Sequence, residues 1–387
     1  MYTIQVLNKI SPLGLNQLEP KDFTVAGECE NPDGILVRSA DMHEMDFGSN
    51  LRAIARAGAG TNNIPLDKCA EAGIVVFNTP GANANAVKEL VIGSLVISSR
   101  DIVAGIKWCW NLTEADGDVE KLVEKKKSQF VGPELLGKNL GVIGLGAVGI
   151  KVANAATKLG MNVYGYDPYL SVQNALVLDS SVKVVDLKTI YEMSDYITIH
   201  SPLLPSTKGM IDETSINSMR HGVRIINLAR GGLVDDGDML AALASGKVAR
   251  YVTDFPNNTL VGKPGVITIP HLGASTPESE ENCAIMAAQE LREYLLTGNI
   301  RNSVNMPAVE MARSGEARLG IIHRNIPKML SNIVTLLSEE GANIENMTNK
   351  SRGDYAYTLI DLGQVITAQT LDHVRNLEGV LRLRIIK

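Results

Sequence analysis

The sequence is poor in aromatic residues and in cysteine. Phe, Trp and Tyr make up 4% of its 387 residues, which argues against a surface that binds single-stranded nucleic acid by stacking bases on aromatic rings. The four cysteines, Cys29, Cys69, Cys109 and Cys283, lie far apart and form no C-x-x-C pair. This pattern predicts a reducing compartment, the cytoplasm, and no metal site.

Long apolar segments and an excess of positive charge are also missing. The longest apolar stretch, around residues 89–97, contains Gly93 and Ser94 and is far too short to cross a bilayer. The N-terminal sequence MYTIQVLNKI alternates like a strand and lacks the apolar core of a signal peptide. The net charge of −6 disfavours a polyanion as partner. We therefore expect neither a membrane nor a nucleic acid as partner.

What the chain does contain is a long series of β-α units. Short runs rich in Val and Ile alternate with helical stretches from Leu140 onward, as expected for parallel strands buried on both faces. A doubly wound parallel sheet of the Rossmann type is therefore predicted within residues 95–274. Residues 86–103 are apolar nearly all round and predict a buried connecting helix, whereas the charged residues 111–128 predict a solvated segment. The strand runs are NLGVIGL, NVYGYD, YITIH, VRIINLA, YVTDF and VITIP.

Two further domains are predicted around this sheet, so the fold class is α/β throughout. Residues 1–94 alternate short strands with helical stretches and predict a second α/β domain. Residues 306–316, with their Pro, Gly and small polar residues, predict a linker. Residues 317–387 follow the order βαββαβ, which is the ferredoxin-like motif.

A glycine-rich turn predicts a dinucleotide site. Gly144, Gly146 and Gly149 follow the strand run LGVI and precede a helix. Glycines at this spacing permit a tight turn, close approach of a pyrophosphate and close packing of helix on strand. Asp167 ends the next strand run, where a carboxylate accepts hydrogen bonds from a ribose diol and repels a 2′-phosphate. NAD is therefore expected rather than NADP.

Two charged or titratable residues follow later strands of the same sheet. Arg230 comes after the run VRII and is followed by Gly231 and Gly232; its guanidinium can bind a carboxylate through two hydrogen bonds. His271 comes after VITI, and a neutral imidazole suits removal of a hydroxyl proton near neutral pH. Ligands bind at the carboxyl ends of strands in such sheets, so both residues are candidates for catalysis.

The ordered motifs resemble the D-isomer-specific 2-hydroxyacid dehydrogenases over nearly the whole chain. These motifs are VRSAD, RAGAGTNNI, NTPGANANAVKEL, GLGAVG, YDP, HSPLLPST, NLARGGLVDDG and PHLGAST. The C-terminal segment is similar to the ACT regulatory module of those members that oxidise 3-phospho-D-glycerate on the way to serine. The resemblance thus implies NAD-dependent oxidation of 3-phosphoglycerate to 3-phosphohydroxypyruvate in a homo-oligomer, a dimer or tetramer, with L-serine as a possible effector. It also implies that residues 1–94 and 275–305 together form a discontinuous, flavodoxin-like substrate-binding domain.

The resemblance also implies roles for individual residues. Arg230 would bind the substrate carboxylate, and His271 would be the acid/base at the C2 oxygen. The substrate would also contact Arg38, Ser39, Arg56 and Asn62. Serine would bind at His323, Asn325 and Asn343, of which the first two are expected in a loop. The cofactor would be lined by Thr79, Gly144, Gly146, Ala147, Val148, Gly149, Asp167, Ser201, Pro202, Leu228, Ala229, Arg230, Asp254, His271, Gly273 and Ala274.

One position departs from the family pattern. The family usually carries a glutamate five residues after the aspartate matched by Asp254, where it supports the catalytic histidine. Here that position is Thr259. Either another carboxylate, such as Glu278, takes over, or the histidine works without a charged partner. The missing glutamate leaves open a weakly active NAD-sensing binding protein on the same fold. A different D-2-hydroxy acid as substrate is a second alternative, because Arg38 and Arg56 favour a doubly anionic substrate but not phosphate specifically.

Overall fold

The computed structural model describes residues 1–386 and divides the chain into two compact units. Unit 1 comprises Met1–Asn83 and Pro277–Lys387, and unit 2 comprises Ala84–Thr276. Lys387, which ends the predicted C-terminal domain, lies outside the described residues. No helix in the described part of the chain is long and apolar enough to cross a membrane.

Unit 2 is built on a seven-stranded parallel sheet with the strand order β12-β11-β10-β9-β6-β7-β8. The order reverses direction between β6 and β9, which is the switch point of a Rossmann sheet. The predicted Rossmann sheet is therefore confirmed. Its strands are β6 (Asn139–Ile143), β7 (Asn162–Tyr166), β8 (Lys183–Val184), β9 (Tyr196–Ile199), β10 (Val223–Asn227), β11 (Val248–Thr253) and β12 (Val266–Thr268).

Helices cover both faces of this sheet, as a sheet with two apolar faces requires. On one face α3 (Ala84–Ser99) and α6 (Ala147–Lys158) bury their apolar side chains. On the other face lie α8 (Leu187–Met193), α9 (Glu213–Ser218) and α10 (Asp236–Ala244). The short α7 (Val172–Val177) follows β7 and buries no residue. The buried connecting helix predicted from the sequence is α3.

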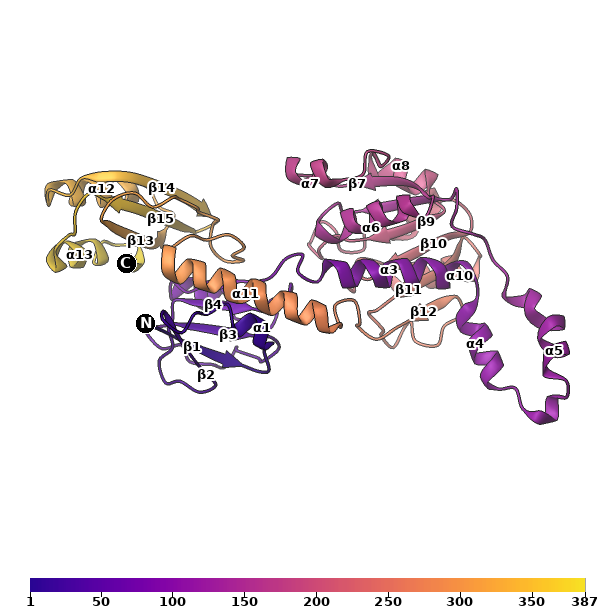
Figure 1. Cartoon of the computed structure of the whole chain (residues 1–387). Coiled ribbons are helices and arrows are strands. Elements are labelled where there is room, and N and C mark those ends of the chain that lie inside the picture. The colour runs from indigo at the N-terminus through magenta and orange to yellow at the C-terminus, as the bar shows by residue number, and fades with distance from the viewer. Residues whose placement is uncertain (387) are drawn as a thin grey trace. The chain divides into compact units, whose positions relative to one another are not determined.

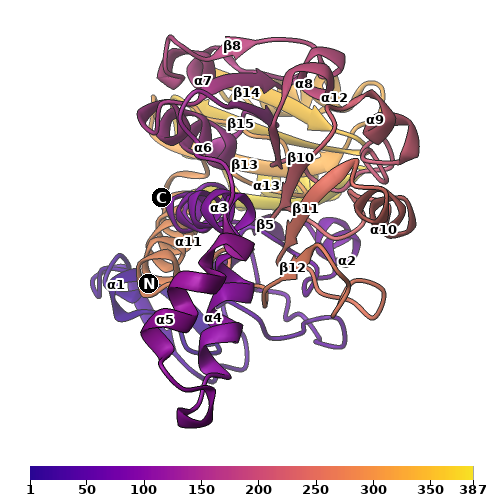
Figure 2. The same cartoon turned by 90° about the vertical axis from the view of Figure 1, so that its right-hand side faces the viewer.

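A helical hairpin projects from this sheet between α3 and β6 (Figures 1 and 2). It consists of α4 (Ile102–Trp110), α5 (Val119–Lys126) and the short 3₁₀ helices η1 (Glu114–Asp116) and η2 (Lys127–Phe130). None of these four elements contains a buried residue. The solvated segment predicted at residues 111–128 is therefore confirmed.

Unit 1 contains a five-stranded parallel sheet with the flavodoxin-like order β2-β1-β3-β4-β5. The chain returns to this unit as its longest helix, α11, which packs a stripe of alanines and leucines on the sheet. The elements are β1 (Tyr2–Leu7), α1 (Pro12–Leu15), β2 (Phe23–Ala26), β3 (Gly34–Val37), β4 (Ala53–Arg56), α2 (Leu66–Glu71), β5 (Val75–Phe77) and α11 (Pro277–Thr297).

The rest of unit 1 is an antiparallel four-stranded sheet with the order β14-β15-β13-β16. Two helices pack against it around a separate apolar core, which confirms the predicted βαββαβ module. Its elements are β13 (Ala317–Arg324), α12 (Met329–Glu339), β14 (Ile344–Arg352), β15 (Tyr355–Leu362), α13 (Ala368–Arg375) and β16 (Val380–Ile386).

This C-terminal module is bound to the end of α11. Arg384 donates to the carbonyl of Leu295 (3.0 Å), Arg318 to that of Thr297 (3.1 Å) and the Tyr357 hydroxyl to that of Gly298 (2.9 Å). Two arginines and one tyrosine hydroxyl therefore donate to carbonyls that the C-terminus of the helix leaves unpaired. The positive charges of the arginines also interact favourably with the negative end of the helix dipole. The segment predicted as a linker also contributes to this packing, because Met306, Val309 and Met311 are buried. These three side chains of the connecting segment belong to the core of unit 1.

Candidate active site

Five parallel strands of unit 2 end at one edge of the sheet, and a predicted site residue follows each of them. Gly144 follows β6, Ser201 follows β9, Arg230 follows β10, Asp254 follows β11 and His271 follows β12. The remaining predicted cofactor residues of this unit lie beside these five: Gly146, Ala147, Val148, Gly149, Asp167, Pro202, Leu228, Ala229, Gly273 and Ala274. The carboxyl edge of such a sheet is where ligands bind.

The glycine turn after β6 has a separate reason for each glycine. Gly144 has φ +94°, and a Cβ there would lie 2.8 Å from the carbonyl oxygen of His200. A Cβ on Gly149 would lie 1.8 Å from the carbonyl oxygen of Gly144, so any side chain would break the turn. A Cβ on Gly146 would meet no protein atom within 4 Å. Gly146 also precedes α6 directly, so open space lies where a helix N-terminus favours a phosphate.

The carboxylate of Asp167 is held by the backbone around it. One oxygen accepts from the Leu145 amide (2.9 Å) and the other from the Tyr169 amide (2.8 Å). Each carboxylate oxygen has two acceptor sites, so both oxygens keep capacity for a ribose diol. The hydrogen bonds from these two amides fix the orientation of the carboxylate.

Arg230 is exposed, and its main chain is fixed by a residue that the sequence analysis did not select. Asn227, at the end of β10, is buried and donates from its amide to the Arg230 carbonyl (2.9 Å). Its amide oxygen accepts from the Ala229 amide (3.2 Å). The Arg230 guanidinium itself donates to the Ala229 carbonyl (2.7 Å). The loop is therefore held in place, while most of the guanidinium donors still face solvent.

Asp254 links two of the loops at this edge. It is buried, and its Oδ2 accepts from the Gly273 amide (3.3 Å). Its Oδ1 has no hydrogen-bond partner among the described residues, and burial raises the pKa of this carboxyl, against the opposing effect of His271 and Arg230. A buried acceptor without a partner is costly, and an amide donor on a ligand would satisfy it.

His271 lies against an aromatic ring. The ring centroids of His271 and Phe255 are 4.8 Å apart and the planes are inclined by 51°. Thr259 belongs to a turn in which its amide donates to the Asn257 side chain (2.9 Å), and Asn257 in turn donates to Asp236 (2.7 Å). Phe255, which the sequence analysis did not select, is therefore the neighbour of the imidazole ring.

The arginines of unit 1 also share a sheet edge. Arg38 follows β3, and Arg56 ends the neighbouring β4 and donates from Nε to the Arg38 carbonyl (3.0 Å). The Arg38 guanidinium pairs with Glu280 of α11 at 2.5 Å, and both side chains are 44% exposed. The chain after Arg38 is fixed by Asn8, whose side chain accepts from the Ser39 amide (3.1 Å). Asn8 and Glu280 were not selected from the sequence.

Two other predicted residues of unit 1 lie in different environments. Thr79 follows β5 and is fully buried, and its amide donates to the Gly58 carbonyl (3.2 Å). Asn62 is exposed in the loop after β4. The parallel order β3-β4-β5 places the chain after Arg38, Arg56 and Thr79 at one edge. These roles in substrate or cofactor binding remain predictions.

The predicted effector residues do not all lie in loops. His323 belongs to β13 and is buried, with Nδ1 at 2.8 Å from the Arg324 carbonyl and Nε2 at 2.9 Å from the Thr358 hydroxyl. Its expected loop position is therefore wrong, because the strand extends to Arg324. Asn325 and Asn343 are exposed, and they donate to the Gly353 carbonyl (3.0 Å) and to Glu345 (2.7 Å).

Comparison with known proteins places this geometry in context. Residues 103–273 match the D-isomer specific 2-hydroxyacid dehydrogenase, NAD binding domain. The chain is 37% identical over 294 residues to D-3-phosphoglycerate dehydrogenase of Archaeoglobus fulgidus, covering 73% of this chain and 53% of that protein. It is 31% identical over 357 residues to the Bacillus subtilis protein of the same name, covering 88% of this chain and 65% of that protein. This chain therefore spans between half and two thirds of the length of these relatives.

Solved structures share the fold. The cofactor (NAD+)-bound 3-phosphoglycerate dehydrogenase of Entamoeba histolytica is 25% identical, with a TM-score of 0.59, over 79% of this chain and 98% of that chain. A glyoxylate/hydroxypyruvate reductase of Sinorhizobium meliloti is 21% identical, with a TM-score of 0.64, over 79% and 98% of the two chains. The second likeness, at its lower identity, concerns the fold alone.

Proposed function

This chain belongs to the D-isomer specific 2-hydroxyacid dehydrogenase family through its NAD-binding domain, and we propose that it oxidises 3-phospho-D-glycerate to 3-phosphohydroxypyruvate with NAD. The observation that carries the proposal is one sheet edge with a glycine turn after β6, the exposed guanidinium of Arg230 after β10 and the imidazole of His271 after β12. The curated relatives named D-3-phosphoglycerate dehydrogenase support this substrate.

The residues of unit 2 fit the NAD that the family implies. The open space at Gly146 and the start of α6 would receive the pyrophosphate. Asp167 would accept from the adenosine ribose, and the unpaired Oδ1 of Asp254 would accept from an amide group such as the nicotinamide carboxamide. When bound, NAD supplies the hydride acceptor for C2.

The chemistry assigned to the protein is positioning and proton transfer. Arg230 would bind the substrate carboxylate through two hydrogen bonds and polarise the C2 oxygen. His271 would take the proton of the C2 hydroxyl as the carbonyl forms. Arg38 and Arg56 would hold the distant phosphate, which would compete with Glu280 for the Arg38 guanidinium.

A substrate assay with a matched variant tests this proposal. Wild-type protein should form NADH from 3-phosphoglycerate, and His271→Asn should lose about 10²- to 10⁴-fold in kcat, because a positioned general base contributes that much. NAD binding, measured by calorimetry, should be retained in the variant. Formation of NADH at equal rates by both proteins would refute the role of His271.

A second candidate function rests on the environment of His271. Phe255 lies against the imidazole, and Thr259 lies five residues after Asp254, where the family usually carries a glutamate. An NAD-sensing binding protein with little turnover would tolerate such an arrangement. NAD binding by wild-type protein without NADH formation from any D-2-hydroxy acid would favour this candidate over the enzyme.

The proposal extends to regulation, assembly and location. The chain would form a dimer or tetramer. L-Serine would bind the C-terminal module at Asn325 and Asn343 and would raise the unfolding temperature of the protein by mass action. Absence of a thermal shift at millimolar serine would refute the effector role.

All four cysteines are free, as suits a reducing compartment such as the cytoplasm.

A further inference from the structure

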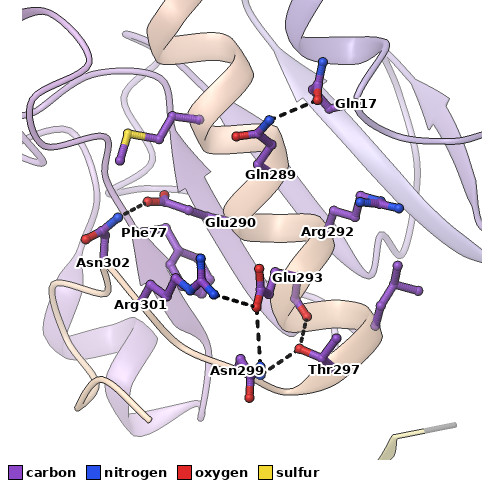
Figure 3. Close-up of a pocket in the computed structure, with 12 residues that line it drawn as sticks. Gln17, Phe77, Gln289, Glu290, Arg292, Glu293, Thr297, Asn299, Arg301 and Asn302 are labelled. Carbon is purple, nitrogen blue, oxygen red and sulfur yellow. Dashed lines mark hydrogen bonds and ion pairs between the residues drawn. The ribbon is translucent and has the colours of Figure 1, made fainter. Parts of the chain in front are cut away.

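A cavity of about 520 Å³ lies in unit 1 and shares no residue with the candidate active site. It runs along the C-terminal half of α11, where Met286, Glu290, Glu293 and Thr297 lie three or four residues apart and therefore share one face of the helix. Figure 3 shows this face together with the loop that carries Asn299, Arg301 and Asn302. Its volume is in the range of small-molecule sites.

Glu290 is the unusual residue of this cavity. It is only 8% exposed. Its Oε1 accepts from the side-chain amide of Asn302 at 2.5 Å (Figure 3), whereas its Oε2 has no hydrogen-bond partner among residues 1–386. A buried carboxylate oxygen without a donor costs free energy. The Asn302 contact fixes the carboxyl group and leaves the second oxygen available to a ligand.

The cationic side chains around the cavity already have carboxylate partners. Arg292 pairs with Glu19 at 2.7 Å, and Arg301 pairs with Glu310 at 3.0 Å and with Glu293 at 3.5 Å. Within residues 1–386, the only side-chain partner of the Glu290 carboxylate is the neutral amide of Asn302. The unmatched charge of the cavity is thus negative, which favours a cationic ligand.

The chemistry of the lining distinguishes two kinds of cation. A metal ion needs several oxygen, nitrogen or sulfur ligands, and no group of three or more His, Cys, Asp or Glu side chains suitable for a metal occurs in the described residues. Phe77, Met286 and Leu296 instead supply an apolar lining. An organic cation can use both the carboxylate and this apolar surface.

We propose that this cavity binds a small organic ligand with a protonated primary amine, whose ammonium group donates to Oε2 of Glu290 while its carbon chain lies on Phe77, Met286 and Leu296. Glu293, one turn further along α11, lines the same cavity. The site is separate from the proposed dehydrogenase reaction, so it stands or falls independently of that activity.

The site has a characteristic pH dependence. Burial raises the pKa of Glu290 to about 7, against the opposing effect of the Asn302 hydrogen bond. An ammonium ligand binds the ionised carboxylate, so binding releases a proton wherever Glu290 is protonated beforehand. The affinity should therefore rise about tenfold between pH 6 and pH 8, as the ionised fraction of a group with this pKa rises.

The test compares n-butylammonium with n-butanol, a neutral molecule of the same length, on the full chain by saturation-transfer NMR. At pH 8 the wild-type protein should bind n-butylammonium at least ~10-fold more tightly than n-butanol. At pH 6 its affinity for n-butylammonium should be about tenfold lower than at pH 8. Glu290→Gln, which keeps the shape and the acceptor for Asn302, should abolish both the preference and the pH dependence.

Glu281→Gln is the matched control, because Glu281 lies on α11 but does not line the cavity. It should bind n-butylammonium like wild type. Equal binding of n-butylammonium and n-butanol by wild-type protein would overturn the proposal. Unchanged n-butylammonium binding by Glu290→Gln would also overturn the proposal. Thermal unfolding of that variant shows separately whether it is folded.

Discussion

Two regions at the same edge of the unit 2 sheet are built in opposite ways. The glycine turn after β6 is defined by backbone packing, with Gly149 in contact with the carbonyl of Gly144, and Asp167 is tied by two amide groups. In contrast, the side chains of Arg230 and His271 are exposed. The region proposed for the cofactor is thus preformed by the fold, whereas the proposed catalytic region leaves the side chains of Arg230 and His271 accessible to a substrate.

The largest expected effect breaks the preformed region itself. Gly149→Ala would place a Cβ 1.8 Å from the Gly144 carbonyl oxygen. Since the position of a Cβ is set by the backbone and the carbonyl belongs to the backbone, the turn has to open. We expect a loss of stability of about 3 kcal/mol or more, measured by thermal or denaturant unfolding.

Gly146→Ala is the matched control for this change. Its Cβ would meet no protein atom within 4 Å, so the unfolding temperature without cofactor should stay close to wild type. Stabilisation by added NAD should fall sharply, because the new methyl group would occupy the space assigned to the pyrophosphate. If Gly146→Ala retained full stabilisation by NAD, the pyrophosphate would have to lie elsewhere.

The next effect concerns the catalytic region alone. Arg230→Lys keeps the charge but loses the planar pair of donors that a carboxylate needs. We expect kcat/KM to fall by ~10²-fold or more with NAD affinity nearly unchanged, as determined by steady-state kinetics and calorimetry. Turnover close to wild type would mean that Arg230 does not bind the substrate.

A smaller effect is expected from the choice of cofactor. A 2′-phosphate on the adenosine ribose would meet the carboxylate of Asp167, which the Leu145 and Tyr169 amides hold in place. NAD should therefore be favoured over NADP by at least ~10-fold in kcat/KM, which corresponds to about 1.4 kcal/mol. Equal use of both cofactors would contradict the role of Asp167.

The sequence predicted the preformed region better than the catalytic one, for a physical reason. Glycine spacing and Val-Ile runs are local patterns, and they identified the turn at Gly144 and the strands around it. The neighbours of a loop side chain depend on tertiary packing instead. The sequence therefore missed Asn227, Phe255 and Glu280, and it placed His323 in a loop although β13 continues through it.

The smallest expected effect follows from one of these differences. Thr259 lies at the position where the family usually carries a glutamate, so Thr259→Glu tests whether a carboxylate at this position would act on His271. In the structure Thr259 is held in a turn by Asn257, and Phe255 is the neighbour of the imidazole. We therefore expect the pH profiles of kcat/KM for wild type and Thr259→Glu to superimpose, and a clear shift of the acid limb would contradict this placement.

The substrate assignment is tested most directly by one ratio, kcat/KM for 3-phospho-D-glycerate divided by kcat/KM for D-glycerate, with NAD. Both substrates carry the carboxylate for Arg230 and the hydroxyl for His271, and they differ only in the phosphate assigned to Arg38 and Arg56. The account predicts a ratio of at least ~10², since the phosphate adds charge-assisted hydrogen bonds of a few kcal/mol in total. A ratio near one, or faster turnover of D-glycerate, would contradict it.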